Sequence, residues 1–340
     1  MAPLVFFGTP EFAVPTLEAL VAADRTPALV VSQPSRPAGR GNQPHLPLVA
    51  RWAREHGLPL LQPERVRSPE FLAELSALRP AIAVVVAFGQ IFPRELLQLP
   101  AQGCLNLHAS LLPRHRGAAP IQAAIAAGDG RTGVTVMRME EGLDSGPILL
   151  QADTAIGPAE TAGELSARLA ELGARLVVDA LDRLERGDLT ASPQDAALAT
   201  LAPRLKREGA RAAWGRPAVE LANQLRAHTP WPGMTAELRG APIKLLRALP
   251  LPAPPPASTA RDAITGAAFD PGAAAASGAD PASGPAEPGT YLGLAPAGIA
   301  VACGAGTALA IAELQRPGRK AQRAGDFVNG ERLRPGERFS

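Results

Sequence analysis

Short apolar runs alternate with helix-forming segments over the first 185 residues, and this alternation limits the possible folds more than any other feature. The run over residues 82–86, Ile-Ala-Val-Val-Val, is typical of a central strand that is covered on both faces. Further short strands are expected over residues 4–7, 28–31 and 58–61, with helices between them. Such alternation predicts an α/β domain: a doubly wound, Rossmann-like, mainly parallel sheet.

The first predicted strand runs into Gly8-Thr9-Pro10, a turn that begins a helix. Thr9 is expected to cap this helix, and Pro10 suits the first helical position. Gly8 stands alone, so the sequence has neither a GxGxxG fingerprint nor a Walker GxxxxGK[ST] motif. We therefore expect no NAD or ATP site.

A later strand that ends in His108 carries the clearest chemical pattern. Leu105 and Leu107 point one way, and Asn106 and His108 the other, because side chains alternate along a strand. Ligands of open α/β sheets bind where strands end, and Asp144 lies in a Gly-flanked turn that could reach this pair. An amide, an imidazole and a carboxylate can serve as an oxyanion donor, a proton carrier and a group that orients the carrier.

Longer motifs surround these residues. The pattern Asn-Leu-His-Ala-Ser-Leu-Leu-Pro-x-x-Arg-Gly-x-x-Pro, followed by Gly-Leu-Asp-Ser-Gly, resembles the signature of the 10-formyltetrahydrofolate-dependent formyltransferases. Phe-Gly-Thr-Pro-Glu-Phe-Ala near the start, and Pro-Trp-Pro-Gly and Asp-Phe-Val-Asn-Gly near the end, are similar to the members that act on methionyl-tRNA. The resemblance implies transfer of the formyl group of 10-formyltetrahydrofolate, without a metal, to the methionine α-amine of initiator methionyl-tRNA.

The resemblance also implies residue roles. Asn106, and His108 when protonated, would stabilise the oxygen of a tetrahedral intermediate, and His108 would carry the proton toward the folate nitrogen. Asp144 would favour the charged form of His108 and order nearby water. Phe88 stands where the family usually has Tyr. The residues expected to line the folate site are Phe88, Gly89, Gln90, Ile91, Ser110, Leu111, Leu112 and Pro113.

Contacts with tRNA are expected from basic residues in loops. Residues 32–45 form a long polar segment, predicted to be a loop, that matches a tRNA-contacting arm of the family, although residues 42–45 depart from its usual basic continuation. A solvated surface role is the alternative for the loop and for the cluster at residues 204–207. For the stretch at residues 314–323 the alternative is a capping loop and final helix. The expected contacts are Arg36, Arg40, Arg204, Lys206, Arg207, Arg316, Arg319 and Lys320.

The composition of the second half predicts a separate domain. Residues 1–189 would form the catalytic domain, residues 190–208 a linker, and residues 209–340 a small, OB-like β-barrel that binds tRNA. Residues 250–288 consist almost wholly of Ala, Pro, Gly, Ser and Asp, and are expected to be a disordered insertion. The expected strands cover residues 235–239, 243–248, 298–303 and 308–314.

Charge and cysteine content exclude several other classes of protein. The net charge of +2 means that binding of nucleic acid depends on local patches. The two cysteines are far apart and lack CxxC spacing, so neither a disulfide framework nor a zinc site is expected. No signal peptide or membrane span is apparent, so we expect a cytoplasmic protein. A monomer is a separate expectation, which these patterns do not establish.

Two alternatives remain open at this point. The same chemistry could act on a small acceptor, such as glycinamide ribonucleotide or an amino sugar, or could hydrolyse the folate. The arginine-bearing arm and the barrel argue against this, because a small acceptor needs neither. A tRNA-binding module with a decayed catalytic site is the second alternative, and the intact Asn106, His108 and Asp144 argue against it.

Overall fold

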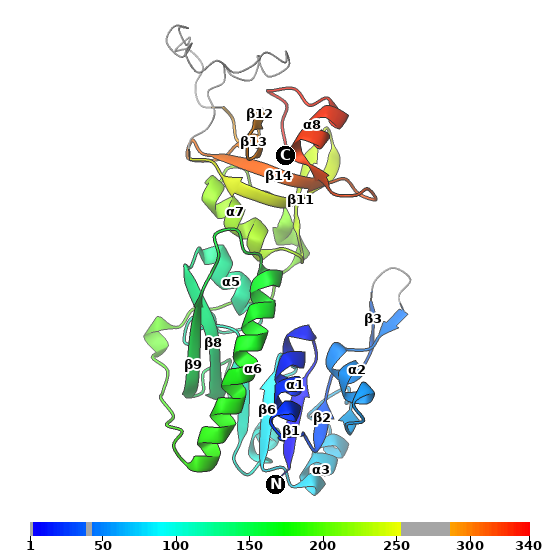
Figure 1. Cartoon of the computed structure of the whole chain (residues 1–340), viewed down its shortest axis with the longest axis vertical. Coiled ribbons are helices and arrows are strands. Elements are labelled where there is room, and N and C mark those ends of the chain that lie inside the picture. Colours follow the sequence, from blue (N-terminus) through cyan, green and yellow to red (C-terminus); the bar gives the residue numbers. More distant parts are fainter. Residues whose placement is uncertain (1–2, 39–42, 253–285) are drawn as a thin grey trace. The chain divides into compact units, whose positions relative to one another are not determined.

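The computed structural model describes residues 3–38, 43–252 and 286–340, which divide into two compact units (Figure 1). The first unit holds most of the chain up to residue 204, and the second holds residues from 205 onward together with residues 125–128 and 158–162. Arg40 and most of the Ala- and Pro-rich insertion lie outside the described residues.

The first unit contains a seven-stranded sheet with the order β5-β2-β1-β6-β7-β8-β9. The first five strands in this order are parallel, and β8 and β9 are antiparallel, so the prediction of a mainly parallel sheet is confirmed. The strands are β1 (Leu4–Gly8), β2 (Leu29–Val31), β5 (Leu60–Leu61), β6 (Ile82–Val86), β7 (Cys104–His108), β8 (Arg131–Arg138) and β9 (Ile148–Ala155).

Helices cover both faces of this sheet, as a doubly wound fold requires. On one face, the core joins Phe7 and Val85 of the strands to side chains of α3 (Pro69–Leu78) and α4 (Arg94–Gln98). On the other face, Gly173 of α6 (Ala162–Arg186) lies directly against Leu107. The remaining helical segments of the first 204 residues are η1 (Glu11–Ala13), α1 (Val14–Ala22), α2 (Leu48–Glu55), α5 (Pro120–Ala127) and η2 (Ala196–Leu198).

Two local predictions for this unit were wrong. The segment predicted as a loop contains a hairpin of β3 (Arg36–Ala38) and β4 (Gln43–His45), which form a separate two-stranded sheet. Proline is tolerated in such a ribbon because both strands have a free edge, so its prolines gave a misleading loop signal. Thr9 does not cap the following helix: its hydroxyl donates to the Phe88 carbonyl oxygen at 2.9 Å.

The second unit is built on an antiparallel sheet with the order β10-β11-β14-β13-β12, and β15 pairs with β14. Phe339 bridges to Leu238 at one sheet edge, and Arg338 bridges to Thr290 beside the other, so the last residues link the two edges of a small barrel. The strands are β10 (Met234–Leu238), β11 (Ala241–Pro250), β12 (Tyr291–Ala295), β13 (Gly298–Ala302), β14 (Ala308–Gln315) and β15 (Gln322–Arg323).

Two helices and a short turn complete this unit: α7 (Ala218–Ala227), α8 (Ala324–Glu331) and η3 (Arg207–Ala210). Phe327 and Phe339 are fully buried in its core. Strand β12 was not predicted, since Gly293 and its short length weaken the strand pattern.

Both cysteines, Cys104 and Cys303, are buried, and burial raises the pKa of each thiol to about 12. Among the described residues, no helix is long and apolar enough to cross a membrane, and no three or more His, Cys, Asp or Glu side chains gather as a metal site would require.

Candidate active site

The candidate site lies where the order of the parallel sheet reverses. The chain runs from β1 outward to β2 and β5, then returns to β6 on the other side of β1, and ligands bind at such a switch point. The loops after β1, β2 and β6 are joined here, because Thr9 Oγ1 and Gln33 Nε2 both donate to the Phe88 carbonyl oxygen, at 2.9 and 2.7 Å.

The first predicted folate segment, residues 88–91, occupies this switch point. The Phe88 side chain is buried, and the centroid of its ring lies 5.3 Å from that of Phe7. A ligand at this segment would therefore meet the backbone of Phe88 and not its ring. Ile91 is 93% exposed and is open to a ligand. Gln90 is turned inward, where its Oε1 accepts a hydrogen bond from the Val66 amide at 3.1 Å.

The second predicted folate segment, residues 110–113, is held by two side chains that sequence reasoning missed. Thr135 Oγ1 donates to the Ser110 carbonyl oxygen at 2.7 Å and accepts from the Leu112 amide at 3.1 Å. Gln151 Nε2 donates to the Leu112 carbonyl oxygen at 2.9 Å. Thr135 lies opposite His108 across the β7–β8 pair, a register that only the antiparallel pairing reveals.

His108 is buried at the end of β7, with a partner for each ring nitrogen. Its Nε2 lies 2.9 Å from the carbonyl oxygen of His115, and its Nδ1 lies 3.6 Å from Asp144 Oδ2. A carbonyl oxygen can only accept, so Nε2 carries the hydrogen of the neutral ring. The lone pair of that ring is then on Nδ1, which faces the carboxylate.

Asp144 is oriented toward His108 from the loop between β8 and β9. The Gly117 amide donates to Asp144 Oδ2 at 2.8 Å, and Gln194 Nε2 donates to the Asp144 carbonyl oxygen at 2.8 Å. Two residues later, Gly146 lies so close to the last residue of β8 that a Cβ there would collide with the Arg138 carbonyl oxygen. Gln194 was also missed: it lies in the segment that composition marks as a linker, and nothing local signals its role.

Asn106 lies on the same face of β7 as His108, as the alternation predicts, and it is partly exposed. Within the part of the chain that the structure describes, no hydrogen bond holds its amide. The structure thus brings an unengaged amide, an imidazole and a carboxylate together beside the segment 110–113.

The basic residues predicted to contact tRNA differ in their surroundings. Those that are exposed are Arg36, Arg204, Lys206, Arg207, Arg319 and Lys320. Arg316 is instead held internally: its side chain is 15% exposed and donates through Nε and Nη2 to both carboxylate oxygens of Glu331, at 3.0 and 2.8 Å. The pKa of Glu331 is lowered, and the hydrogen bonds from Arg316 are the largest cause of this shift.

Comparison with known proteins is consistent with this architecture. Residues 2–181 match the formyl transferase family, and residues 204–332 match the formyl transferase C-terminal domain. Fold and site therefore define a two-domain formyl transferase.

Curated relatives narrow this class. The chain is 47% identical to a methionyl-tRNA formyltransferase from Synechococcus, over 99% of this chain and 98% of the relative. It is 46% identical to a methionyl-tRNA formyltransferase from Anaeromyxobacter dehalogenans, over 97% of both chains. The chain belongs to the methionyl-tRNA formyltransferase family.

Solved structures of lower identity share the fold. An N-formyltransferase from Helicobacter canadensis superposes with a TM-score of 0.60 at 15% identity, covering 91% of this chain and 98% of that one. HypX from Aquifex aeolicus, solved in complex with tetrahydrofolic acid, superposes with a TM-score of 0.58 at 15% identity over 96% of this chain and 46% of its own.

Proposed function

We propose that this protein transfers the formyl group of 10-formyltetrahydrofolate to the α-amine of methionine on initiator methionyl-tRNA, for translation initiation. Membership of the methionyl-tRNA formyltransferase family supports the acceptor and the formyl donor. The observation that carries the chemistry is the convergence of Asn106, His108 and Asp144 at the end of β7.

In this proposal the free amine attacks the formyl carbon and forms a tetrahedral intermediate. The Asn106 amide, which is free to donate, stabilises the oxyanion together with protonated His108. The amine loses a proton, the bond between the formyl carbon and folate N10 breaks, and N10 gains a proton. The proton passes through His108, which gives its own proton to N10 and takes up the one that the amine loses. Asp144 Oδ2 lies 3.6 Å from His108 Nδ1 and orients the ring.

The folate would lie between the two segments at the strand ends, residues 88–91 and 110–113. The backbones of both segments are fixed before the ligand binds, by hydrogen bonds from Thr9, Gln33, Thr135 and Gln151. This fixation reduces the ordering that binding must otherwise achieve.

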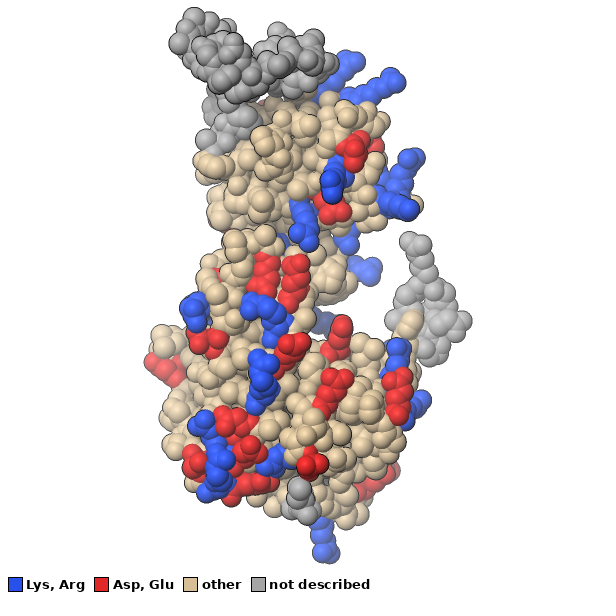
Figure 2. All heavy atoms as spheres, in the orientation of Figure 1, with Lys and Arg blue, Asp and Glu red and all other residues tan. Residues whose placement is uncertain are grey.

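Initiator tRNA would contact exposed basic side chains on both units. Arg36 is on the β3–β4 hairpin, and Arg319 and Lys320 are exposed near the end of β14. On the faces visible in Figure 2, acidic and basic side chains are interspersed over the first unit, whereas basic side chains predominate over the second. We therefore assign phosphate contacts to Arg319 and Lys320, and expect Arg316 to support them structurally.

The direct test of this function is a formyl-transfer assay with 10-formyltetrahydrofolate and three acceptors: methionyl initiator tRNA, glycinamide ribonucleotide and an amino-sugar nucleotide. We expect product on the tRNA alone. Product on a small acceptor would mean that the hairpin and the barrel do not serve to bind tRNA. Binding of tRNA without any product would favour a decayed catalytic site.

The residue roles are tested by substitution. His108→Ala should abolish turnover, and Asn106→Ala should lower kcat about 10²–10³-fold, the effect of losing one oxyanion donor. Neither change should alter the affinity for tRNA. His56→Ala is the matched control, because this histidine is exposed, stacks on Trp52 and donates from Nδ1 to the Trp52 carbonyl oxygen at 2.8 Å, far along the chain from the candidate site. Wild-type turnover in His108→Ala would refute the mechanism.

We further propose that the protein works as a monomer in the cytoplasm, where its charged tRNA substrate is made. Light scattering after size-exclusion chromatography would show the mass of one chain, 35.2 kDa, or a multiple of it.

A further inference from the structure

Four residues, Arg114 to Gly117, contact Ser110, His108 and Asp144 of the candidate site through their backbone, and we call them the supporting loop. The Arg114 carbonyl oxygen accepts from Ser110 Oγ at 2.6 Å, and the His115 carbonyl oxygen accepts from His108 Nε2 at 2.9 Å. The Gly117 amide donates to Asp144 Oδ2 at 2.8 Å. The position of this loop therefore determines the geometry of both His108 and Asp144.

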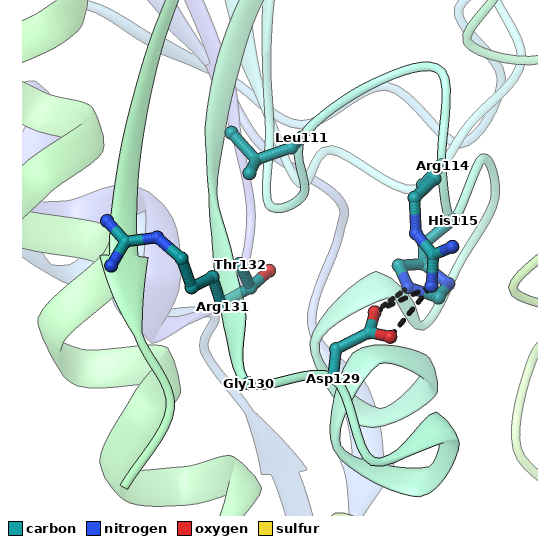
Figure 3. Close-up of a pocket in the computed structure, with 7 residues that line it drawn as sticks. All are labelled: Leu111, Arg114, His115, Asp129, Gly130, Arg131 and Thr132. Atoms are coloured by element: carbon teal, nitrogen blue, oxygen red, sulfur yellow. Dashed lines mark hydrogen bonds and ion pairs between the residues drawn. The ribbon is translucent and has the colours of Figure 1, made fainter. Parts of the chain in front are cut away.

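One carboxylate holds the supporting loop from outside the site. Asp129, just after α5, accepts from Arg114 Nη2 at 2.7 and 2.9 Å and from His115 Nε2 at 2.7 Å (Figure 3). Two successive loop side chains thus converge on Asp129, while their two carbonyl oxygens face Ser110 and His108.

The loop conformation needs such support. His115 has a φ of +59°, in the left-handed region that side chains other than glycine rarely adopt. The cluster also borders a cavity of about 210 Å³, so the loop is not backed by tightly packed side chains on that side. Besides the bond to Asp129, the His115 amide donates to Thr200 Oγ1 at 2.9 Å.

We propose that Asp129 and His115 are positioning residues for formyl transfer. By holding the supporting loop, they keep the His115 carbonyl oxygen on His108 Nε2, so that the hydrogen of the neutral ring stays on Nε2. Nδ1, which faces Asp144, is then the nitrogen that takes up and releases the proton. This inference rests on the proposed role of His108.

The test compares variants that differ in one hydrogen bond. His115→Phe keeps an aromatic ring but cannot donate to Asp129, whereas His115→Gln keeps a donor at the same position. Asp129→Asn removes the charge that both loop side chains share. Asp153→Asn is the control, because it breaks an exposed ion pair with Arg131 near the same end of β8.

We expect His115→Phe and Asp129→Asn to lower kcat about 10- to 100-fold, because small displacements of catalytic groups have effects of this size. The KM values for tRNA and folate should stay within about twofold of wild type, since the variants leave the proposed binding residues in place. His115→Gln should retain more of kcat than His115→Phe, and Asp153→Asn should match wild type.

A second readout separates positioning from stability. The chain has five histidines, so ¹⁵N spectra of histidine-labelled protein can be assigned by single substitutions. In wild type the spectrum should show His108 protonated at Nε2, and in His115→Phe and Asp129→Asn its two nitrogens should move toward a mixture of tautomers.

Two results would overturn the inference. One is wild-type kcat in both His115→Phe and Asp129→Asn. The other is a loss of kcat that accompanies a lower Tm while the His108 spectrum is unchanged, which would indicate a purely structural ion pair. Absence of formyl transfer to methionyl initiator tRNA by the wild-type protein would instead refute the proposed function, so the two failures are distinguishable.

Discussion

Replacing Arg316 by methionine should destabilise the second unit, although the sequence pattern marks this residue as a tRNA contact. The guanidinium lies beneath the barrel surface, bonded to both Glu331 oxygens and 5.7 Å from the centroid of the Phe327 ring. Methionine keeps the apolar stem and removes the charge, so Glu331 loses its cationic partner.

The expected cost follows from this geometry. Removing one partner of a buried ion pair costs about 3–5 kcal/mol, and exposed pairs contribute about 0–1 kcal/mol. The Arg316 and Glu331 side chains are 15% and 27% exposed, so we expect a loss of about 2–3 kcal/mol, nearer the buried limit. For a unit of this size that corresponds to a fall in Tm of about 10 °C.

The assay is thermal unfolding of Arg316→Met and wild type between pH 7 and pH 3. The pKa of Glu331 is lowered in the folded protein. The ion pair therefore makes its full contribution to stability above the ordinary glutamate pKa of about 4.3, and this contribution is lost as the pH falls through the lowered pKa. The Tm difference should therefore shrink in acid.

Arg319→Gln is the comparison for tRNA binding, since Arg319 is exposed. We expect weaker tRNA binding from Arg319→Gln with an unchanged Tm. If Arg316→Met had a wild-type Tm and weakened tRNA binding as much as Arg319→Gln does, the structural role assigned to Arg316 would be refuted.

Three further predictions concern other parts of the chain. In Gly173→Ala the new methyl would lie 2.5 Å from Leu107 Cδ2, so urea denaturation should show a loss of about 1–3 kcal/mol; an unchanged midpoint would mean that α6 shifts freely. Burial lowers the pKa of His228, so its neutral form stabilises the fold above about pH 6.5, and this contribution is lost as the pH falls. His228→Gln should therefore flatten the fall in Tm between about pH 7 and pH 5. A Tm that falls as steeply in His228→Gln as in wild type would contradict this. Lys320→Gln should reduce the slope of log tRNA affinity against log salt by about 1, and an unchanged slope would exclude a phosphate contact.

Local patterns in the sequence were sufficient for much of the fold. The apolar run over residues 82–86 is the central strand β6, and the alternation up to His108 correctly puts Asn106 and His108 on one face of β7. Ser68 caps α3, accepting a hydrogen bond from the Phe71 amide. These features depend on side-chain period and on contacts within a few residues, which a sequence displays directly.

The support of the site could not be read in this way. Gln194 meets Asp144 across 50 residues of chain, and Gln151 meets Leu112 across 39. A glutamine in a loop has the same local pattern whether or not it later meets such a partner. Thr9 illustrates the reverse case, because its local pattern predicted a helix cap and a distant carbonyl oxygen took its hydroxyl instead.

The sequence by itself therefore determined the strands and helices, the shared face of Asn106 and His108, and the family to which the motifs point. Only the tertiary structure decided which ring nitrogen of His108 carries its hydrogen, that Arg316 pairs with Glu331, and that Asp129 holds the supporting loop. The physical reason is that periodicity and capping act between near neighbours in the chain, whereas these hydrogen bonds form only after folding brings distant segments within about 3 Å of one another.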